Sequence, residues 1–161
     1  MSILKIDDKN EIYYEYIEPK SKGCTFVFVN ALTGNTDAWN GEIGNKLTEQ
    51  GNGYLAYNFR GQEKSKFDET LILDTDLIVS DLCLLLESLK PSNVVLVGLS
   101  IGGLYATLAL QKGINSLGII LINTLRKNSL RLEWINQTMV NVARYGGTSL
   151  LMDFNMPVIA S

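Results

Sequence analysis

The sequence predicts an α/β fold in which a mostly parallel sheet carries helices on both faces. Strand-like and helix-like runs alternate along the 161 residues, which is typical of a sheet built from crossover connections. The strand-like run 24–30, "CTFVFVN", is apolar at successive positions, as a parallel strand covered on both faces is. With 46% hydrophobic and 19% charged residues, the chain is expected to fold as about one globular domain.

The predicted elements begin with an N-terminal hairpin. Its strands, 2–6 and 11–19, pair across the turn Asp7–Asn10. Strand–helix repeats follow, up to a sixth strand. The four later strands are expected at 24–30, 53–59, 93–98 and 116–123. The helices are expected at 35–51 with Asn35 or Thr36 as its cap, at 74–90, from Ser100 to Gly113, and at 130–147.

Composition excludes several function classes. A net charge of −3 and the lack of a basic run argue against a nucleic-acid partner. The uncharged stretch 91–111 is interrupted by glycines, so no membrane span is expected. The polar N-terminus "MSILKIDDKNEIYY" does not resemble a secretory signal, which favours a cytoplasmic protein. Cys24 and Cys83 are expected to be free thiols rather than a disulfide, and no cofactor and no metal are expected.

One motif predicts a reactive serine between a strand and a helix. Ser100 lies between the apolar strand "NVVLV" and the apolar helix "LYATLAL". The surrounding pattern is G-x-S-x-G with one glycine added, formed by Gly98, Leu99, Ser100, Ile101, Gly102 and Gly103. A sharp turn of this kind exposes the serine oxygen and directs the following N–H, of Ile101, toward a developing oxyanion. The alternative is that Ser100 only caps the helix; a phosphate loop is excluded because no Gly-Lys-Ser/Thr follows.

The chain resembles the α/β-hydrolase fold enzymes in several segments in the right order. The segment 26–39, "FVFVNALTGNTDAW", is similar to the strand and oxyanion loop of the family, which usually reads His-Gly-x. The segment 57–65, "YNFRGQEKS", is similar to the family's Asp-x-Arg-Gly-x-Gly-x-Ser loop. "VVLVGLSIGGLYATLAL" resembles the nucleophile segment, and "GIILINT" the strand after it.

The resemblance implies a role for each matching residue. Ser100 would be the catalytic nucleophile, and the backbone N–H groups of Leu32 and Ile101 would form the oxyanion hole. Asn30 would hold the oxyanion loop, and Arg60 would brace the neighbouring loop, although a solvated surface arginine is the alternative for Arg60. The chain departs from the family pattern at four positions. Asn30 and Ala31 replace the His-Gly pair, Asn58 replaces the acid, and Glu63 replaces a glycine.

The general base is missing, because the chain contains no histidine. In the family, the acid and the histidine follow later strands. Residues 1–126 are therefore expected to be the N-terminal part of an incomplete hydrolase core, and residues 127–161 the start of the cap that family members insert over the site. We favour a truncated portion of a longer hydrolase; a natural short non-catalytic protein and a lysine base for Ser100 are the alternatives.

The predicted function is that of a serine hydrolase acting on ester bonds, inactive alone. Its substrate would be a small ester or acyl compound. The alternatives are an acyltransferase of the same fold and a non-catalytic pseudoenzyme or binding module. An incomplete sheet would leave the sixth strand, 117–122, as an apolar edge, so self-association is expected through it or through the cap segment 150–160, "LLMDFNMPVIA".

Overall fold

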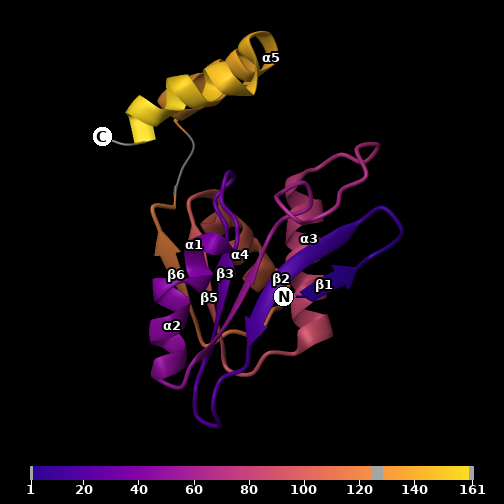
Figure 1. The fold of residues 1–161 in the computed structure, drawn as a ribbon, viewed down its shortest axis with the longest axis vertical. Helices are drawn as coiled ribbons and strands as arrows, with labels where there is room; N and C mark the ends of the chain where they lie inside the picture. Colours follow the sequence, from indigo (N-terminus) through magenta and orange to yellow (C-terminus); the bar gives the residue numbers. More distant parts are fainter. Residues whose placement is uncertain (1, 125–128, 160–161) are drawn as a thin grey trace. The chain divides into compact units, whose positions relative to one another are not determined.

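The computed structural model describes residues 2–124 and 129–159 (Figure 1). The chain divides into two compact units, Met1–Leu125 and Arg126–Ser161. The first unit contains a six-stranded sheet with its helices, and the second contains one long helix. The candidate functional residues lie in the first unit.

The sheet has the order β1-β2-β4-β3-β5-β6. Its strands are β1 Ser2–Lys5, β2 Glu11–Ile17, β3 Thr25–Val29, β4 Gly53–Tyr57, β5 Val94–Leu99 and β6 Gly118–Ile122. The first two strands form the predicted hairpin, and β2 continues antiparallel to β4. The other neighbouring pairs are parallel. The predicted α/β fold with a mostly parallel sheet is thus confirmed, and the carboxyl ends of β3, β4, β5 and β6 lie at one edge.

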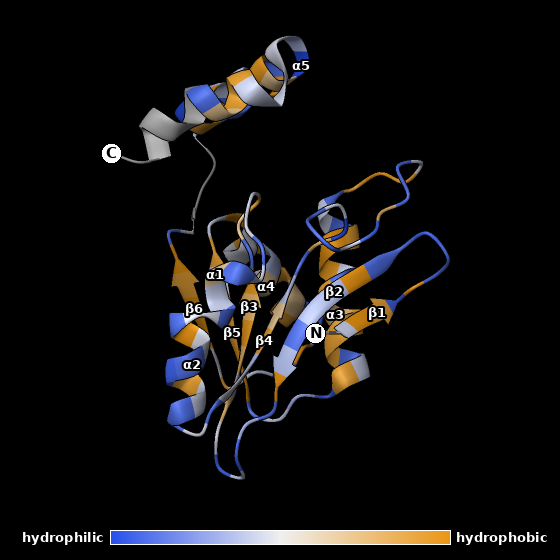
Figure 2. Ribbon diagram, in the orientation of Figure 1, coloured by the Kyte–Doolittle hydropathy of each residue, from blue (hydrophilic) through white to orange (hydrophobic). Residues whose placement is uncertain are grey.

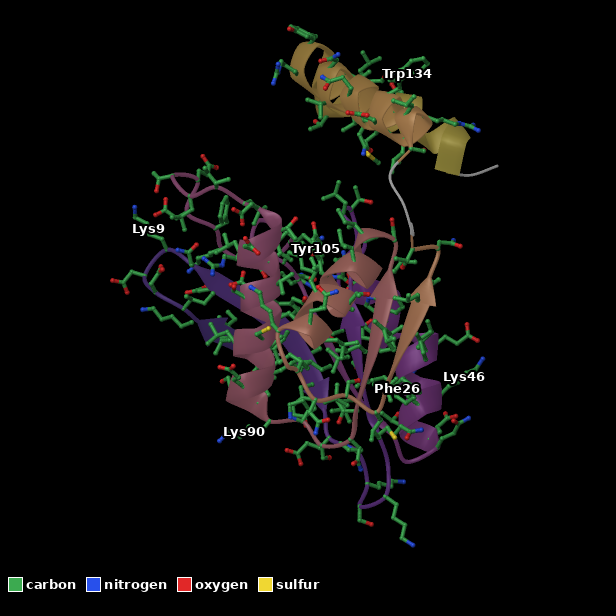
Figure 3. The ribbon with its side chains drawn as sticks, turned by 180° about the vertical axis from the view of Figure 1, so that it is seen from behind. Lys9, Phe26, Lys46, Lys90, Tyr105 and Trp134 are labelled. Carbon is green, nitrogen blue, oxygen red and sulfur yellow. The ribbon has the colours of Figure 1, made fainter. Side chains whose placement is uncertain are left out.

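Helices cover both faces of this sheet. They are α1 Asp37–Asn40, α2 Glu42–Glu49, α3 Thr75–Leu89 and α4 Ile101–Gln111. Side chains alternate along β3: Val27 and Val29 join the cluster formed with α3 and α4, whereas Phe28 faces the side of α1. There the Phe28 ring stacks on Trp39 of α1 with 4.4 Å between ring centroids. Figure 3 shows the opposite face, where Tyr105 of α4 points into the core.

The prediction of a single helix over 35–51 is wrong, because the structure has two helices there. Gly41 separates α1 from α2 with a non-helical backbone (φ −79°, ψ −117°). Glycine carries the highest entropic cost in a helix interior, so it is a natural place for the break. Of the two predicted caps, Thr36 occupies the cap position without a capping side-chain bond. The Asn35 Oδ1 instead accepts a hydrogen bond from the Asp37 N–H at 3.0 Å.

The second unit consists of helix α5, Leu130–Ile159. Gly147 breaks it with a left-handed φ of 73°. The helix predicted over 130–147 therefore ends at the expected glycine, but a further helical run follows. Of the predicted cap segment 150–160, the side chains beyond Asp153 and residue 160 lie outside the described residues. Within the described ranges, no helix is both long and apolar enough to cross a lipid bilayer.

The sixth strand forms an apolar edge of the sheet. Figure 2 shows β6 in the hydrophobic colour at the end of the strand order. Within the part of the chain that the structure describes, β6 pairs with β5 alone. Its exposed apolar side chains and that of the preceding residue are Leu117, Ile120, Leu121 and Ile122, with exposed fractions from 37% to 67%.

Candidate active site

Ser100 occupies the turn between β5 and α4. Its backbone is left-handed (φ 55°, ψ −121°), a conformation that costs a non-glycine residue about 1–3 kcal/mol and that surrounding contacts must enforce. One such contact is the hydrogen bond from the Ser100 N–H to the Ile122 carbonyl of β6, at 2.9 Å. The Ser100 hydroxyl makes no capping bond to α4, so the serine is not used as a helix cap. Its half-buried side chain is left for another role.

Three glycines make this turn possible. A Cβ on Gly98 would overlap the backbone of Gly103, and a Cβ on Gly103 would overlap the side chain of Thr124. A Cβ on Gly102 would overlap the carbonyl oxygens of Val29 and Asn30 at the end of β3. None of the three needs a positive φ. Glycine is required here by close approach rather than by conformational freedom.

The contact between Gly102 and β3 brings two loops together. Val29 pairs with Gly98 in the parallel β3–β5 register, so both strands end at the same level. Beyond β3 the chain continues into the predicted oxyanion loop, with Asn30 buried and Leu32 69% exposed. Because the first turn of α4 lies against the end of β3, the loop containing Leu32 starts beside the turn that carries Ser100.

The two amides predicted for an oxyanion hole, those of Leu32 and Ile101, have no hydrogen-bond acceptor within residues 2–124 and 129–159. Among the described residues, neither the Leu32 N–H nor the Ile101 N–H donates a hydrogen bond to a backbone carbonyl. The Ile101 N–H is the first of helix α4, where unpaired amide groups and the helix dipole favour negative charge. Two unpaired amides at neighbouring strand ends are what an oxyanion site requires.

Asn30 fixes the base of the predicted oxyanion loop. This fully buried side chain donates from Nδ2 to the Tyr57 carbonyl of β4 at 2.7 Å. Its Oδ1 accepts a hydrogen bond from the Trp39 indole N–H at 2.6 Å. The amide thus links β3, β4 and α1 with its donor and its acceptor both in use.

Two residues in the loop after β4 support the same region. Asn58, also fully buried, accepts from the Thr36 N–H at 2.9 Å and donates to the Glu63 carbonyl. Gln62 reaches in the opposite direction and donates from Nε2 to the carbonyls of Ala31 and Leu32, at 3.1 and 3.0 Å. The loop after β4 is therefore bonded directly to the loop after β3.

Arg60 is buried rather than a solvated surface arginine. Its guanidinium makes a two-point ion pair with the buried Asp81 of α3, with 2.7 Å between Nε and Oδ2. Burial raises the pKa of Asp81, and the hydrogen bond and charge of Arg60 oppose that shift. This pair joins the loop after β4 to α3. Sequence reasoning missed Asp81, although it stands on the apolar stripe of its helix between Ile78 and Leu85, where a lone carboxylate signals a buried partner.

Sequence reasoning also missed the hydrogen-bond partners of the Glu15 carboxylate. Glu15 of β2 accepts hydrogen bonds from the Tyr13 hydroxyl at 2.8 Å, Asn40 at 2.9 Å and Thr36 at 3.2 Å. Burial raises the pKa of Glu15, but these three hydrogen bonds lower it by more, so the net pKa lies below the ordinary value. Burial and the bond to Glu15 raise the pKa of Tyr13 to about 12. The alternating strand pattern around Glu15 showed a carboxylate on one face but not its partners.

The described residues contain no group of three His, Cys, Asp or Glu side chains that could hold a metal ion. Cys24 and Cys83 are free thiols. The described part of the candidate site therefore consists of a serine hydroxyl, backbone amides and supporting amide side chains. These groups can bind and stabilise an oxyanion formed at a carbonyl carbon.

Comparison with known proteins identifies the family of this fold. A family model described as "alpha/beta hydrolase fold" matches residues 25–150. A comparison with curated protein sequences gave no significant match.

Three solved structures share the fold at low sequence identity. One is from a study of carboxylesterases of the ammonia-oxidizing thaumarchaeon Nitrososphaera gargenis, with a TM-score of 0.81 and 23% identity over 96% of this chain and 57% of that chain. An esterase from Exiguobacterium antarcticum has a TM-score of 0.77 and 22% identity, covering 95% and 59%. The α/β-hydrolase enzyme MGS-M2, from a Medee basin deep-sea metagenome library, has a TM-score of 0.83 and 23% identity, covering 97% and 56%. The chain thus spans 56–59% of the length of these structures.

The Gly102→Ala substitution tests the close approach of α4 to β3. The added Cβ would overlap two backbone oxygens, which cannot rotate away as a flexible side chain would. We expect the free energy of unfolding to fall by about 1–3 kcal/mol, measured by urea denaturation with circular dichroism. The control is Gly118→Ala, where nothing lies within 4 Å of the added Cβ. Equal stability of the two variants would contradict the packing described here.

The Glu15→Gln substitution tests the hydrogen bonds that the Glu15 carboxylate accepts. Because the folded-state pKa of Glu15 is lowered, the ionised group stabilises the fold above its unfolded pKa, and this contribution is lost as the pH falls through the folded pKa. The variant is therefore expected to be less stable than the wild type at neutral pH, with a difference that shrinks below the ordinary glutamate pKa of about 4.3. Urea denaturation across this range measures it. Glu49→Gln, at an exposed position in α2, is the control, and a pH-independent difference for Glu15→Gln would contradict the assignment.

Proposed function

Because the chain belongs to the α/β-hydrolase fold family, we propose that it carries the nucleophile part of a serine hydrolase site for carboxylic esters. The observation that supports this most directly is the left-handed backbone of Ser100 between β5 and α4, inside a turn that only glycine neighbours permit. Such a turn presents a serine oxygen at the carboxyl edge of a parallel sheet. The names of two structural relatives, a carboxylesterase and an esterase, favour an ester as the substrate.

The proposed reaction is acyl transfer through Ser100. The Ser100 Oγ attacks the ester carbonyl carbon and gives its proton to a base, and the carbonyl oxygen becomes an oxyanion on the N–H groups of Leu32 and Ile101. Collapse expels the alcohol and leaves an acyl-serine. Water then releases the acid, and an acceptor alcohol in place of water would make the same chemistry an acyl transfer. In this proposal Asn30 holds the oxyanion loop, and Arg60 braces the loop after β4 through Asp81.

The base and the acid are proposed to come from outside these 161 residues. The sequence contains no histidine, and it spans 56–59% of the length of the three structures compared above. Loss of the histidine of a catalytic triad costs on the order of 10⁶ in turnover, and the oxyanion hole and binding retain about 10³–10⁴ over water. The 161 residues alone are therefore proposed to bind a tetrahedral species far better than they turn over an ester.

Two measurements on the 161-residue chain test this proposal. Hydrolysis of a chromogenic short-chain ester is expected to stay close to the rate without protein. Butylboronic acid is expected to form a tetrahedral adduct, in which the Ser100 Oγ bonds to boron, the serine proton passes to buffer and a boron oxygen faces the two amides. The ¹¹B resonance reports the change from trigonal to tetrahedral boron.

Ser100→Ala is the matched variant for both measurements. It is expected to abolish the boron adduct while the far-ultraviolet circular dichroism is unchanged. An adduct that persists in Ser100→Ala would exclude Ser100 as the nucleophile. Rapid ester hydrolysis that Ser100→Ala removes would show instead that a base for Ser100 lies within these residues.

We also propose that the 161-residue chain self-associates through β6. Apolar side chains are exposed along this edge, and an exposed apolar edge strand is a template for pairing with another chain. Leu121, which is 51% exposed, lies within the strand, one residue before its end. The cap segment 150–160, named above as the second candidate surface, is described only in part.

The Leu121→Lys substitution is expected to reduce this association. A lysine on an edge strand disfavours edge-to-edge pairing, because two paired edges would bring like charges together and bury them. Light scattering coupled to size-exclusion chromatography is the measurement, with the wild type expected to have a larger mean mass. Ile43→Lys, at a 44% exposed position of α2, is the matched control and should behave as the wild type does. A wild-type chain that is monomeric in dilute solution would refute the proposal.

A further inference from the structure

The Gln62 side chain bridges the loop after β4 and the predicted oxyanion loop. Its Oε1 accepts a hydrogen bond from the Phe59 N–H at 2.8 Å, within its own loop. Its Nε2 donates to the carbonyls of Ala31 and Leu32, at 3.1 and 3.0 Å. Gln62 is half-buried, so these bonds are partly shielded from water. One amide therefore contacts two successive peptide groups of the other loop.

These contacts determine the direction of the Leu32 N–H. The Ala31 carbonyl and the Leu32 N–H belong to the same peptide group, and the described chain has no cis peptide bond. In a trans peptide the carbonyl and the N–H point in opposite directions. Holding the Ala31 carbonyl on Gln62 therefore turns the Leu32 N–H away from Gln62.

The next peptide is held in the same way. The Leu32 carbonyl also accepts from Gln62, so both peptide groups that flank the Leu32 α-carbon are anchored. The Gly34 N–H bonds to the Ala31 carbonyl at 3.0 Å and closes a local turn. That bond shapes the loop internally, whereas the bonds from Gln62 fix the orientation of the loop relative to β4. Asn30 holds the start of the loop through its bonds to Tyr57 and Trp39, and its Nδ2 also donates to the Gln62 Oε1 at 3.5 Å.

We propose that Gln62 is a positioning residue for the oxyanion hole, because it aims the Leu32 N–H at the oxyanion formed on Ser100. This inference rests on the proposed function, in which that N–H receives the negative charge. Gln62 itself touches no reacting atom. A glutamine suits this role because its single side-chain amide accepts from Phe59 and donates to two carbonyls at once. A carboxylate of the same length keeps the acceptor and loses both donated bonds.

The test compares two variants of Gln62 with a control in the same loop. Gln62→Glu keeps an acceptor for the N–H groups of Phe59 and Asn30 but has no donor at neutral pH. Gln62→Met removes all four side-chain hydrogen bonds. Lys66→Gln is the control, because Lys66 pairs with Glu11 across 3.0 Å. Residual dipolar couplings of backbone N–H groups report the orientation of the Leu32 amide directly, and those of β3 and β5 show that the sheet is retained. The second readout is the affinity for butylboronic acid.

In both Gln62 variants the coupling of the Leu32 N–H is expected to change, while those of Ile101 and the sheet stay as in the wild type. The affinity for butylboronic acid is expected to fall by about tenfold or more, up to the 10²–10³ that complete loss of one oxyanion-hole donor costs. Lys66→Gln should match the wild type in both readouts. A purely structural role for Gln62 would change the sheet couplings or stability without reorienting Leu32.

The outcomes separate this inference from the proposed function. An unchanged Leu32 coupling in both variants, or an affinity within twofold of the wild type despite a reoriented amide, overturns the positioning role of Gln62. Failure of the wild type to form any boron adduct overturns the proposed function, and with it the oxyanion that Gln62 is proposed to serve. If Gln62→Met does not fold, Gln62→Glu alone decides, since it retains the bond to Phe59.

Discussion

The candidate site depends on the contact between the first turn of α4 and the end of β3. Gly102 lies so close to the carbonyls of Val29 and Asn30 that no side chain fits between them. Ser100, with its positive φ, lies two residues before this contact, and the loop that contains Leu32 starts at the β3 end of it. The favourable packing of α4 on the sheet, through Tyr105, Ala106 and Ala109, offsets the local backbone strain.

Buried amide side chains then hold the loops around this contact. Asn30 and Asn58 each use an acceptor and a donor simultaneously, and Gln62 does so across two loops. The two asparagines stand where the family pattern has a histidine and an acid. At position 58 an ionised aspartate could accept from the Thr36 N–H but could not donate to the Glu63 carbonyl. Both buried asparagine side chains thus have hydrogen-bond partners for their donor and their acceptor.

The end of strand β6 also contacts the turn that carries Ser100. The Ile122 carbonyl at its end accepts the Ser100 N–H, and Thr124 beyond it fills the space left by Gly103. The serine turn is therefore held between two strand ends, those of β3 and β6. The same strand carries the exposed apolar side chains of the sheet edge, so a partner on that edge would lie next to an element that orients Ser100.

Local patterns in the sequence determined the fold class, the order of the elements, the family and the glycine-rich serine turn, because these depend on periodicity and on residues close together along the chain. The position of the break at Gly41 was not fixed by the glycine alone, since Gly44 lies only three residues later inside the continuous helix α2. Only the tertiary structure decided the partners of Arg60, Glu15 and Gln62. Several of their hydrogen bonds join residues 21 to 31 positions apart, and side-chain identity alone does not specify which distant group will be brought within reach.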